Sequence, residues 1–162
     1  GGGGGAFGRA LARRLPLRRG ALPLGVAWLL VRVLAQMKPG HEGQGTQQAC
    51  MPSKAESILV STFKYVAEAW SIQDFVISTE TAHQVYVSHF LVFAMEILKP
   101  EEIEHGLVFI VQGVSNRLES SIPAVRRSGM AVGEAMARAV GQGELDFEEL
   151  RPGPPPGGPE ER

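Results

Sequence analysis

Apolar residues recur every three or four positions through the middle of the chain, which predicts a series of amphipathic helices. The first is expected to begin at Ser53, because Glu56 follows three residues later and completes a capping box. Its apolar side is formed by Ile58, Leu59, Phe63, Val66 and Trp70. This helix should be covered on one face only.

After a break at residues 71–78, a second helix capped by Ser78 or Thr79 is expected to run to Leu98. Its apolar arc is wide enough to need cover from more than one neighbour, so it should be the central core helix. The arc contains Val85, Tyr86, Val87, Phe90, Leu91, Phe93, Ala94, Ile97 and Leu98.

A third helix is predicted from Pro100, with acidic residues in its first turn at the positive end of the helix dipole. Its buried side should be Ile103, Leu107, Ile110, Val111, Val114 and Leu118. Residues 120–123 then form a corner into a last helix that fades near Gly141 and Gly143. Because Gly129 and Gly133 lie on its apolar side, this last helix should let a neighbour approach closely.

The helical-repeat segment therefore covers residues 53–142, and the predicted class is all-α. Successive helices joined by short corners favour antiparallel pairs, and a pair period near 40 residues is typical of a HEAT-like α-solenoid. An ordinary four- or five-helix bundle would give much the same pattern. The periodicity leaves both alternatives open.

The rest of the chain differs in composition. Residues 1–20 are rich in Gly and Arg and carry no acid, so we expect a disordered basic segment. Residues 21–38 predict an isolated apolar helix, residues 39–52 a linker, and residues 143–162 an acidic, Pro/Gly-rich disordered tail. Because Gly1 stands where a methionine is usual, we expect the amino terminus of the parent protein to lie further upstream.

The stretch from Arg13 to Val31 imitates a signal sequence, and import or membrane insertion is one alternative. The apolar run is interrupted by Arg32 and is shorter than the roughly 20 residues that span a bilayer. We therefore expect no membrane partner. The formal net charge of −1 also argues against a bulk polyanion as partner, although the basic segment 1–20 could bind nucleic acid nonspecifically.

Candidate chemistry is sparse. His41, His83, His89 and His105 lack metal-ligand spacing, and the single Cys50 has no second cysteine to pair with. The sequence contains no nucleophile elbow, phosphate-binding glycine loop or HExxH motif. We therefore expect no catalytic residue, no cofactor, no metal and no enzymatic activity.

Three arginines around the last corner could form a partner-docking patch for phosphate or acidic side chains. They are Arg117, Arg126 and Arg127. The alternative is that arginines here simply solvate exposed faces, as Arg138 would by pairing with Glu134 one turn earlier.

Three sequence strings carry a family resemblance: ILVSTFKYVAEAWS at residues 58–71, GVSNRLES at 113–120 and SIPAVRRSGMAVGEAM at 121–136. Through them the chain resembles the telomere length regulation protein family, over residues 57 to about 150. That family is the helical-repeat scaffold of the TTT co-chaperone complex. The resemblance implies an α-solenoid that acts by binding partners and breaks no bond.

The resemblance also implies partners. These are the companion TTT subunits, the phosphatidylinositol-3-kinase-related kinases, and a heat-shock chaperone with its adaptor complex. It further implies a role in TOR signalling, the DNA-damage response and telomere maintenance, in the cytoplasm and nucleus and at telomeres. The family's acidic serine motif for the chaperone adaptor has no counterpart before Arg162. The alternative function is binding of telomeric DNA through the basic segment 1–20.

Overall fold

The computed structural model describes residues 16–17, 23–37, 57–143, 147 and 150. The described residues form helices and contain no strand, as the all-α prediction requires. The elements are α2 (Leu24–Gln36), α3 (Ile58–Ser71), α4 (Gln73–Ser78), α5 (Thr81–Ile97), α6 (Pro100–Ile103), the 3-10 turn η1 (Glu104–Gly106), α7 (Leu107–Leu118) and α8 (Pro123–Ala139). Most of the basic segment 1–20, the linker 39–52 and nearly all of the tail 143–162 lie outside the described residues.

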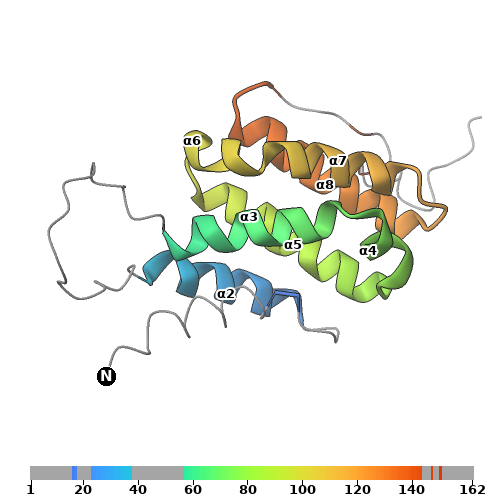
Figure 1. The fold of residues 1–162 in the computed structure, drawn as a ribbon, viewed down its shortest axis with the longest axis horizontal. Helices are drawn as coiled ribbons and strands as arrows, with labels where there is room; N and C mark the ends of the chain where they lie inside the picture. The colour runs from blue at the N-terminus through green and yellow to red at the C-terminus, as the bar shows by residue number, and fades with distance from the viewer. Residues whose placement is uncertain (1–15, 18–22, 38–56, 144–146, 148–149, 151–162) are drawn as a thin grey trace, which may run out of the picture.

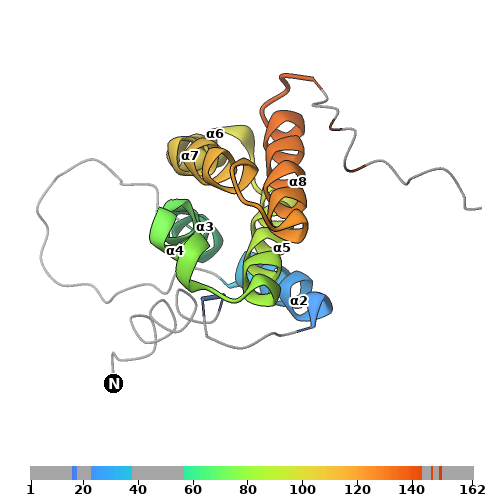
Figure 2. The same cartoon turned by 90° about the vertical axis from the view of Figure 1, so that its right-hand side faces the viewer.

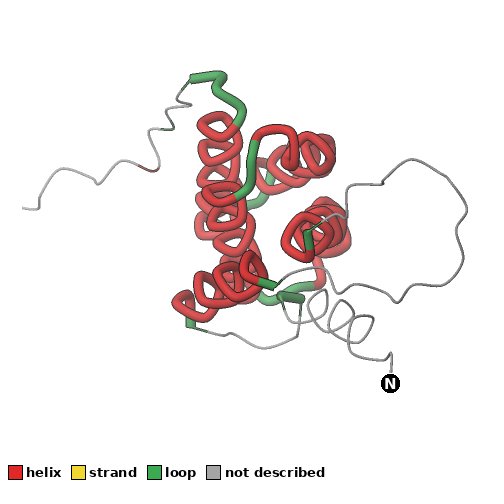
Figure 3. The backbone as a smooth tube through the Cα atoms, turned by 90° about the vertical axis from the view of Figure 1, so that its left-hand side faces the viewer, coloured by secondary structure: helices red, strands yellow, loops and turns green. Residues whose placement is uncertain are grey.

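The long helices form two layers. Figure 2 shows α8, α5 and α2 stacked in one layer beside α7 and α3 in the other, and Figure 3 shows the same two columns from the opposite side. In Figure 1, α3 and α7 run in one direction, while α2, α5 and α8 run in the opposite direction. Parallel neighbours within each layer and antiparallel pairs between layers are the arrangement of a helical-repeat solenoid. The solenoid prediction is confirmed, and the up-and-down bundle is excluded.

Helix α5 is the centre of the core, as predicted. It packs against α8, α2 and α3, and its Tyr86, Phe90 and Leu91 are buried. The wide apolar arc exists because α5 has neighbours on several sides. Ile97 was predicted to be buried but is 43% exposed, since it lies with the exposed Glu96 on the outer side of the last turn, whereas Met95 and Leu98 are buried.

Helix α2 belongs to the same body. It packs against α5 and α3, and Ala27, Val31 and Leu34 are buried in the shared core. The prediction of an isolated helix is therefore corrected: α2 extends the α5–α8 layer by one helix (Figure 1). Among the described residues, none of the helices has the length and apolar character needed to cross a membrane.

The start of α3 lies later than predicted. Ser57 is the N-cap, and its side chain accepts a hydrogen bond of 3.2 Å from the backbone N–H of Val60. The predicted cap at Ser53 and its partner Glu56 lie outside the described residues. The predicted apolar side of α3 is confirmed, because all five of its residues are buried.

The predicted break at residues 71–78 contains the short helix α4. The N-cap of α5 is Glu80 rather than Ser78 or Thr79, and its side chain makes no capping hydrogen bond. Ser78 instead donates its hydroxyl proton to the carbonyl oxygen of Asp74 at 2.7 Å, within α4. The hydroxyl therefore bonds back into its own helix, as serines near a helix end often do.

The third predicted helix is interrupted. It forms as α6, η1 and α7, because Gly106 in the η1 turn lies against Phe63 of α3, where an added Cβ would come within 2.7 Å of the ring. The acidic first turn is confirmed, since Glu102 accepts a hydrogen bond of 2.9 Å from the Lys99 N–H. Ile103 and Ile110 are buried as predicted. Val111 (54% exposed) and Leu118 (38% exposed) were placed on the wrong face, because α7 packs mainly against α3 and α8 and its other side has no such neighbour among the described helices.

Helix α8 packs closely on α7, as its glycines predicted. An added Cβ at Gly129 would come within 2.8 Å of the Arg117 Cβ, and one at Gly133 would contact Val114 at 3.6 Å. The helix ends at Ala139 with Val140 as its C-cap, and Gly141 follows with a φ of +70°, which side chains disfavour. The Gly141 N–H donates to the Arg138 carbonyl at 3.2 Å and the Gln142 N–H to the Ala137 carbonyl at 3.0 Å, which is a Schellman ending.

Candidate protein-docking site

The carboxyl end of α3 is held by an arginine from α7. Arg117 is fully buried, and its Nη1 donates to the Trp70 carbonyl at 2.8 Å and to the Gly113 carbonyl at 3.0 Å. The guanidinium carbon lies 3.7 Å from the centroid of the Trp70 ring and 5.8 Å from that of Phe75. Gly113 makes this possible, because any Cβ there would collide with the Trp70 ring.

The Arg117 charge has no counterion among the described residues, and its Nε and Nη2 have no hydrogen-bond partner there. Burial lowers the pKa of the guanidinium below its ordinary value, to about 9, so the group still carries its proton at neutral pH. The negative end of the α3 dipole and the face of the indole ring stabilise this charge. Arg117 is therefore a helix C-cap supplied from a neighbouring helix.

Neighbouring polar side chains extend this contact. Asn116 donates through Nδ2 to the Ser71 carbonyl at 2.7 Å. On the other side, the Trp70 indole N–H donates to Ser88 Oγ at 3.0 Å, and that hydroxyl donates to the Gln84 carbonyl at 2.8 Å. Trp70 is thus hydrogen-bonded to a helix of each layer, α7 and α5. These bonds fix the end of α3, where α4 begins.

The three predicted docking arginines do not form one patch. Arg117 lies in the interior, so a partner cannot contact it, and the prediction for this residue is wrong because Trp70 and the end of α3 cover it. Arg117 lies on the same helical face as Ile110 and Gly113, and this spacing is the sequence signal that could have predicted its burial. Arg126 donates to the Ser120 carbonyl at 2.9 Å and Arg127 is exposed. For these two, partner docking stays a prediction.

Arg138 was expected to pair with Glu134 on an exposed face, and the structure shows this pair. Arg138 lies 3.9 Å from the Glu134 carboxylate, one turn apart on α8. Its side chain is half exposed, so this pair adds only about 0.3–0.5 kcal/mol to stability.

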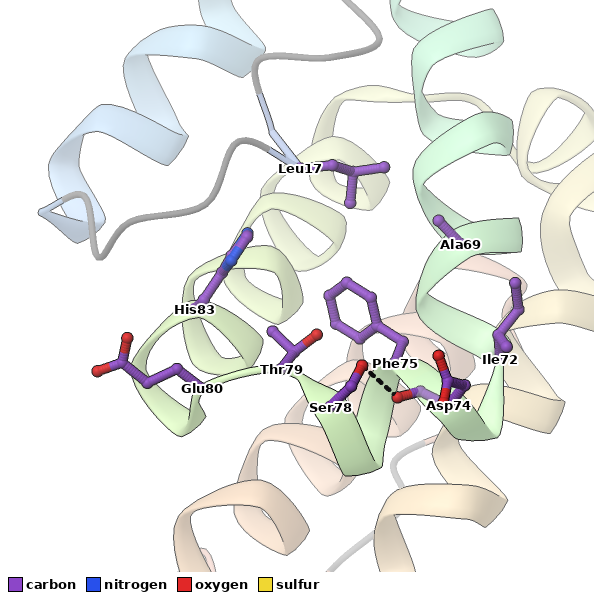
Figure 4. Close-up of a pocket in the computed structure, with 9 residues that line it drawn as sticks. All are labelled: Leu17, Ala69, Ile72, Asp74, Phe75, Ser78, Thr79, Glu80 and His83. Carbon is purple, nitrogen blue, oxygen red and sulfur yellow. Dashed lines mark hydrogen bonds between the residues drawn. The ribbon is translucent and has the colours of Figure 1, made fainter.

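Beside the Trp70 end of α3, α4 and the start of α5 enclose a groove of about 500 Å³ (Figure 4). Leu17 packs across it from the segment before α2. The lining residues are Leu17, Ala69, Ile72, Asp74, Phe75, Ser78, Thr79, Glu80 and His83. Gln84 fixes the shape of this corner, because its Nε2 donates to the Val76 carbonyl at 3.0 Å and to the Thr79 carbonyl at 2.9 Å.

His83 is the one titratable side chain of the groove that is buried, at 4% exposure. Its ring lies edge-on to Phe75 at 6.1 Å and tilted to Tyr86 at 6.4 Å. His83 Nε2 has no hydrogen-bond partner among the described residues. Nor do those residues contain a cluster of three His, Cys, Asp or Glu side chains able to hold a metal ion. His41 and Cys50 lie outside the described residues.

Apolar side chains also face outward. On α7, Val108 is 78% exposed, and Val111 and Leu118 share its outer face. At the other edge of the stack, Trp28, Leu29 and Val33 of α2 are exposed. A helical stack with apolar outer faces and a groove can bind other polypeptides.

The two-layer helical fold agrees with a comparison of the sequence with known protein families. The TELO2 ARM repeat domain matches residues 22–145, a span that includes every helix from α2 to α8. The chain belongs to the TELO2 ARM repeat domain family. In this TELO2 ARM repeat domain, the Arg117 contact and all of the groove except Leu17 lie inside the matched span.

Known relatives carry the corresponding name. The telomere length regulation protein TEL2 homolog of Xenopus laevis is 31% identical over 87 residues, which is 51% of this chain and 10% of the relative. The proteins of that name from mouse and human are each 29% identical over 94 residues, 56% of this chain and 11% of the relative. The ARM repeat chain thus spans about a tenth of the length of these curated relatives. No solved structure matches it.

Proposed function

We propose that the chain is a section of a non-enzymatic scaffold of the TTT co-chaperone complex. The observation that carries this proposal is the two-layer helical stack, which belongs to the TELO2 ARM repeat domain family and presents apolar side chains outward on α2 and α7. Stacked helical repeats offer long surfaces for protein contacts and need no catalytic group.

The partners of the parent protein follow from the family. We expect it to hold the companion TTT subunits and to bind phosphatidylinositol-3-kinase-related kinases. A heat-shock chaperone and its adaptor complex would be recruited through a segment other than this one. The consequence would be stable kinases for TOR signalling, DNA-damage response and telomere maintenance, in the cytoplasm and the nucleus.

The outer face of α7 is the surface we assign to partner contact. Val108, Val111 and Leu118 are exposed on one side of this helix, with the exposed Ser115 between Val111 and Leu118. The opposite side, with Ile110 and Gly113, is buried against α3 and α8. An exposed side of this kind suits an apolar helix of a partner protein.

The experiment is coprecipitation of the full-length parent protein with the TTT subunits and the kinases. Recovery of both groups is the expected result. Absence of both, with the parent protein folded and expressed, would refute the scaffold proposal.

A further inference from the structure

The groove at α4 has a polar lining that consists of hydrogen-bond acceptors and hydroxyl groups. Asp74 and Glu80 contribute carboxylates, Ser78 and Thr79 contribute hydroxyls, and the described residues that line the groove include no lysine or arginine. The apolar walls are Leu17, Ala69, Ile72 and Phe75. This chemistry favours a ligand that combines a cation with apolar surface.

His83 is an independent observation that points to a ligand. The side chain is more than nine-tenths buried, lines the groove, and its Nε2 lacks a hydrogen-bond partner among the described residues. Buried nitrogens of this kind are nearly always hydrogen-bonded in folded proteins. In Figure 4 the imidazole rises from α5 on the side of the groove where Leu17 lies. A backbone N–H of a bound segment would satisfy it.

The two carboxylates are separated. In Figure 4, Asp74 and Glu80 lie on opposite sides of Phe75. We propose that this groove binds a partner-protein segment in which an apolar residue is flanked by two basic residues. The apolar side chain packs between Leu17 and Phe75, and the basic side chains pair with Asp74 and Glu80. This inference deepens the proposed scaffold function by naming the chemistry of one bound segment.

The charge of the groove supports this occupant over an acidic one. A phosphopeptide or an acidic segment would meet Asp74 and Glu80 with no lysine or arginine among the described lining residues to offset the repulsion. Both carboxylates are exposed, so the charge contribution should weaken with added salt.

The test uses the 162-residue chain and the synthetic peptide acetyl-Arg-Ala-Leu-Ala-Arg-amide. Its matched control carries citrulline, a neutral side chain of the same shape, in place of each arginine. Binding is followed by NMR through the amide signals of α4 and the start of α5. We expect saturable shifts there, with an affinity roughly threefold to tenfold weaker for the citrulline peptide.

Two variants separate the groove from nonspecific attraction. Asp74→Asn with Glu80→Gln should lower the affinity by a similar factor, and His83→Phe should lower it further. The control Glu101→Gln with Glu104→Gln removes the same charge from exposed positions on α6 and η1 and should leave the affinity unchanged. Equal binding of both peptides, or shifts outside α4 and α5, would overturn the proposal.

The chain's own arginines are the competing occupant. If Arg18→Gln with Arg19→Gln shifts the groove signals while the added peptide binds neither form, the segment around Leu17 fills the groove and the proposal is overturned. Failure of peptide binding leaves coprecipitation of the parent protein unaffected. The two proposals can therefore fail separately.

Discussion

The guanidinium of Arg117 stacks on the Trp70 ring at 3.7 Å and donates to the carbonyl oxygen of the same residue at 2.8 Å. One side chain of α7 thus binds both the ring and the backbone at the end of α3. The contact joins two parallel helices of one layer, and it fixes the point from which α4 and the groove begin.

Removing this side chain should destabilise the fold. Arg117→Ala leaves the Trp70 carbonyl without a side-chain donor and opens a cavity beside the Trp70 ring, so we expect the free energy of unfolding to fall by about 2–4 kcal/mol. Denaturant unfolding measures this. Arg127→Ala, at an exposed position, should change the value by less than about 0.5 kcal/mol. Similar effects of the two substitutions would contradict the assignment of Arg117 to the interior.

The two faces of α7 should respond differently to truncation. Ile110 is fully buried and Val111 is 54% exposed. Ile110→Ala should therefore cost about 2–4 kcal/mol of unfolding free energy, and Val111→Ala less than about 0.5 kcal/mol. Thermal and denaturant unfolding of the two variants checks this, and a larger loss for Val111→Ala would mean that α7 is turned the other way.

Glycine substitutions should separate close packing from helix propensity. Gly113→Ala places a methyl group in the Trp70 ring and should destabilise the chain by about 1–3 kcal/mol. Gly25→Ala, on the exposed side of α2 with no atom within 4 Å of the added Cβ, should instead stabilise it by up to about 1 kcal/mol. The melting temperatures should move in opposite directions. A stabilising Gly113→Ala would rule out the close approach of α7 to α3.

The contribution of Tyr86 to the stability of the fold should fall at alkaline pH. Burial raises the pKa of its hydroxyl above the ordinary value of 10, so above pH 10 the unfolded chain loses this proton first. Fewer protons are then bound in the unfolded state, and the contribution of Tyr86 to stability falls as pH rises. The contribution of Arg117 to stability has the opposite sign above pH 9, because burial lowers its pKa in the folded chain to about 9 and the unfolded chain keeps the proton to higher pH.

Comparison with Tyr86→Phe isolates the tyrosine contribution. The variant should be as stable as the original chain or more stable at pH 7, because the hydroxyl has no hydrogen-bond partner among the described residues. Between pH 9 and 11, unfolding measurements should show a shallower loss, or a larger gain, of stability for the variant. Parallel pH profiles would exclude a buried hydroxyl.

The sequence predicts the parts of this fold that depend on local periodicity. The buried face of α3 and the central role of α5 follow from apolar spacing, and the close packing of α8 follows from Gly129 and Gly133. The break at Gly106 could not be predicted, because it depends on Phe63 lying opposite in another helix. The burial of Arg117 and the exposure of Val111 likewise depend on which side of α7 has neighbours.

The central claim is that the stack leaves the outer face of α7 free for partners. The most direct test is coprecipitation of the full-length parent protein carrying Val108→Asp and Val111→Asp, beside a control with Gln142→Asp at an exposed position. Circular dichroism of the corresponding chains verifies that the helices remain intact. We predict that the double variant loses at least one TTT subunit or kinase while the control keeps them all. Unchanged recovery of every partner by the folded double variant would contradict this account.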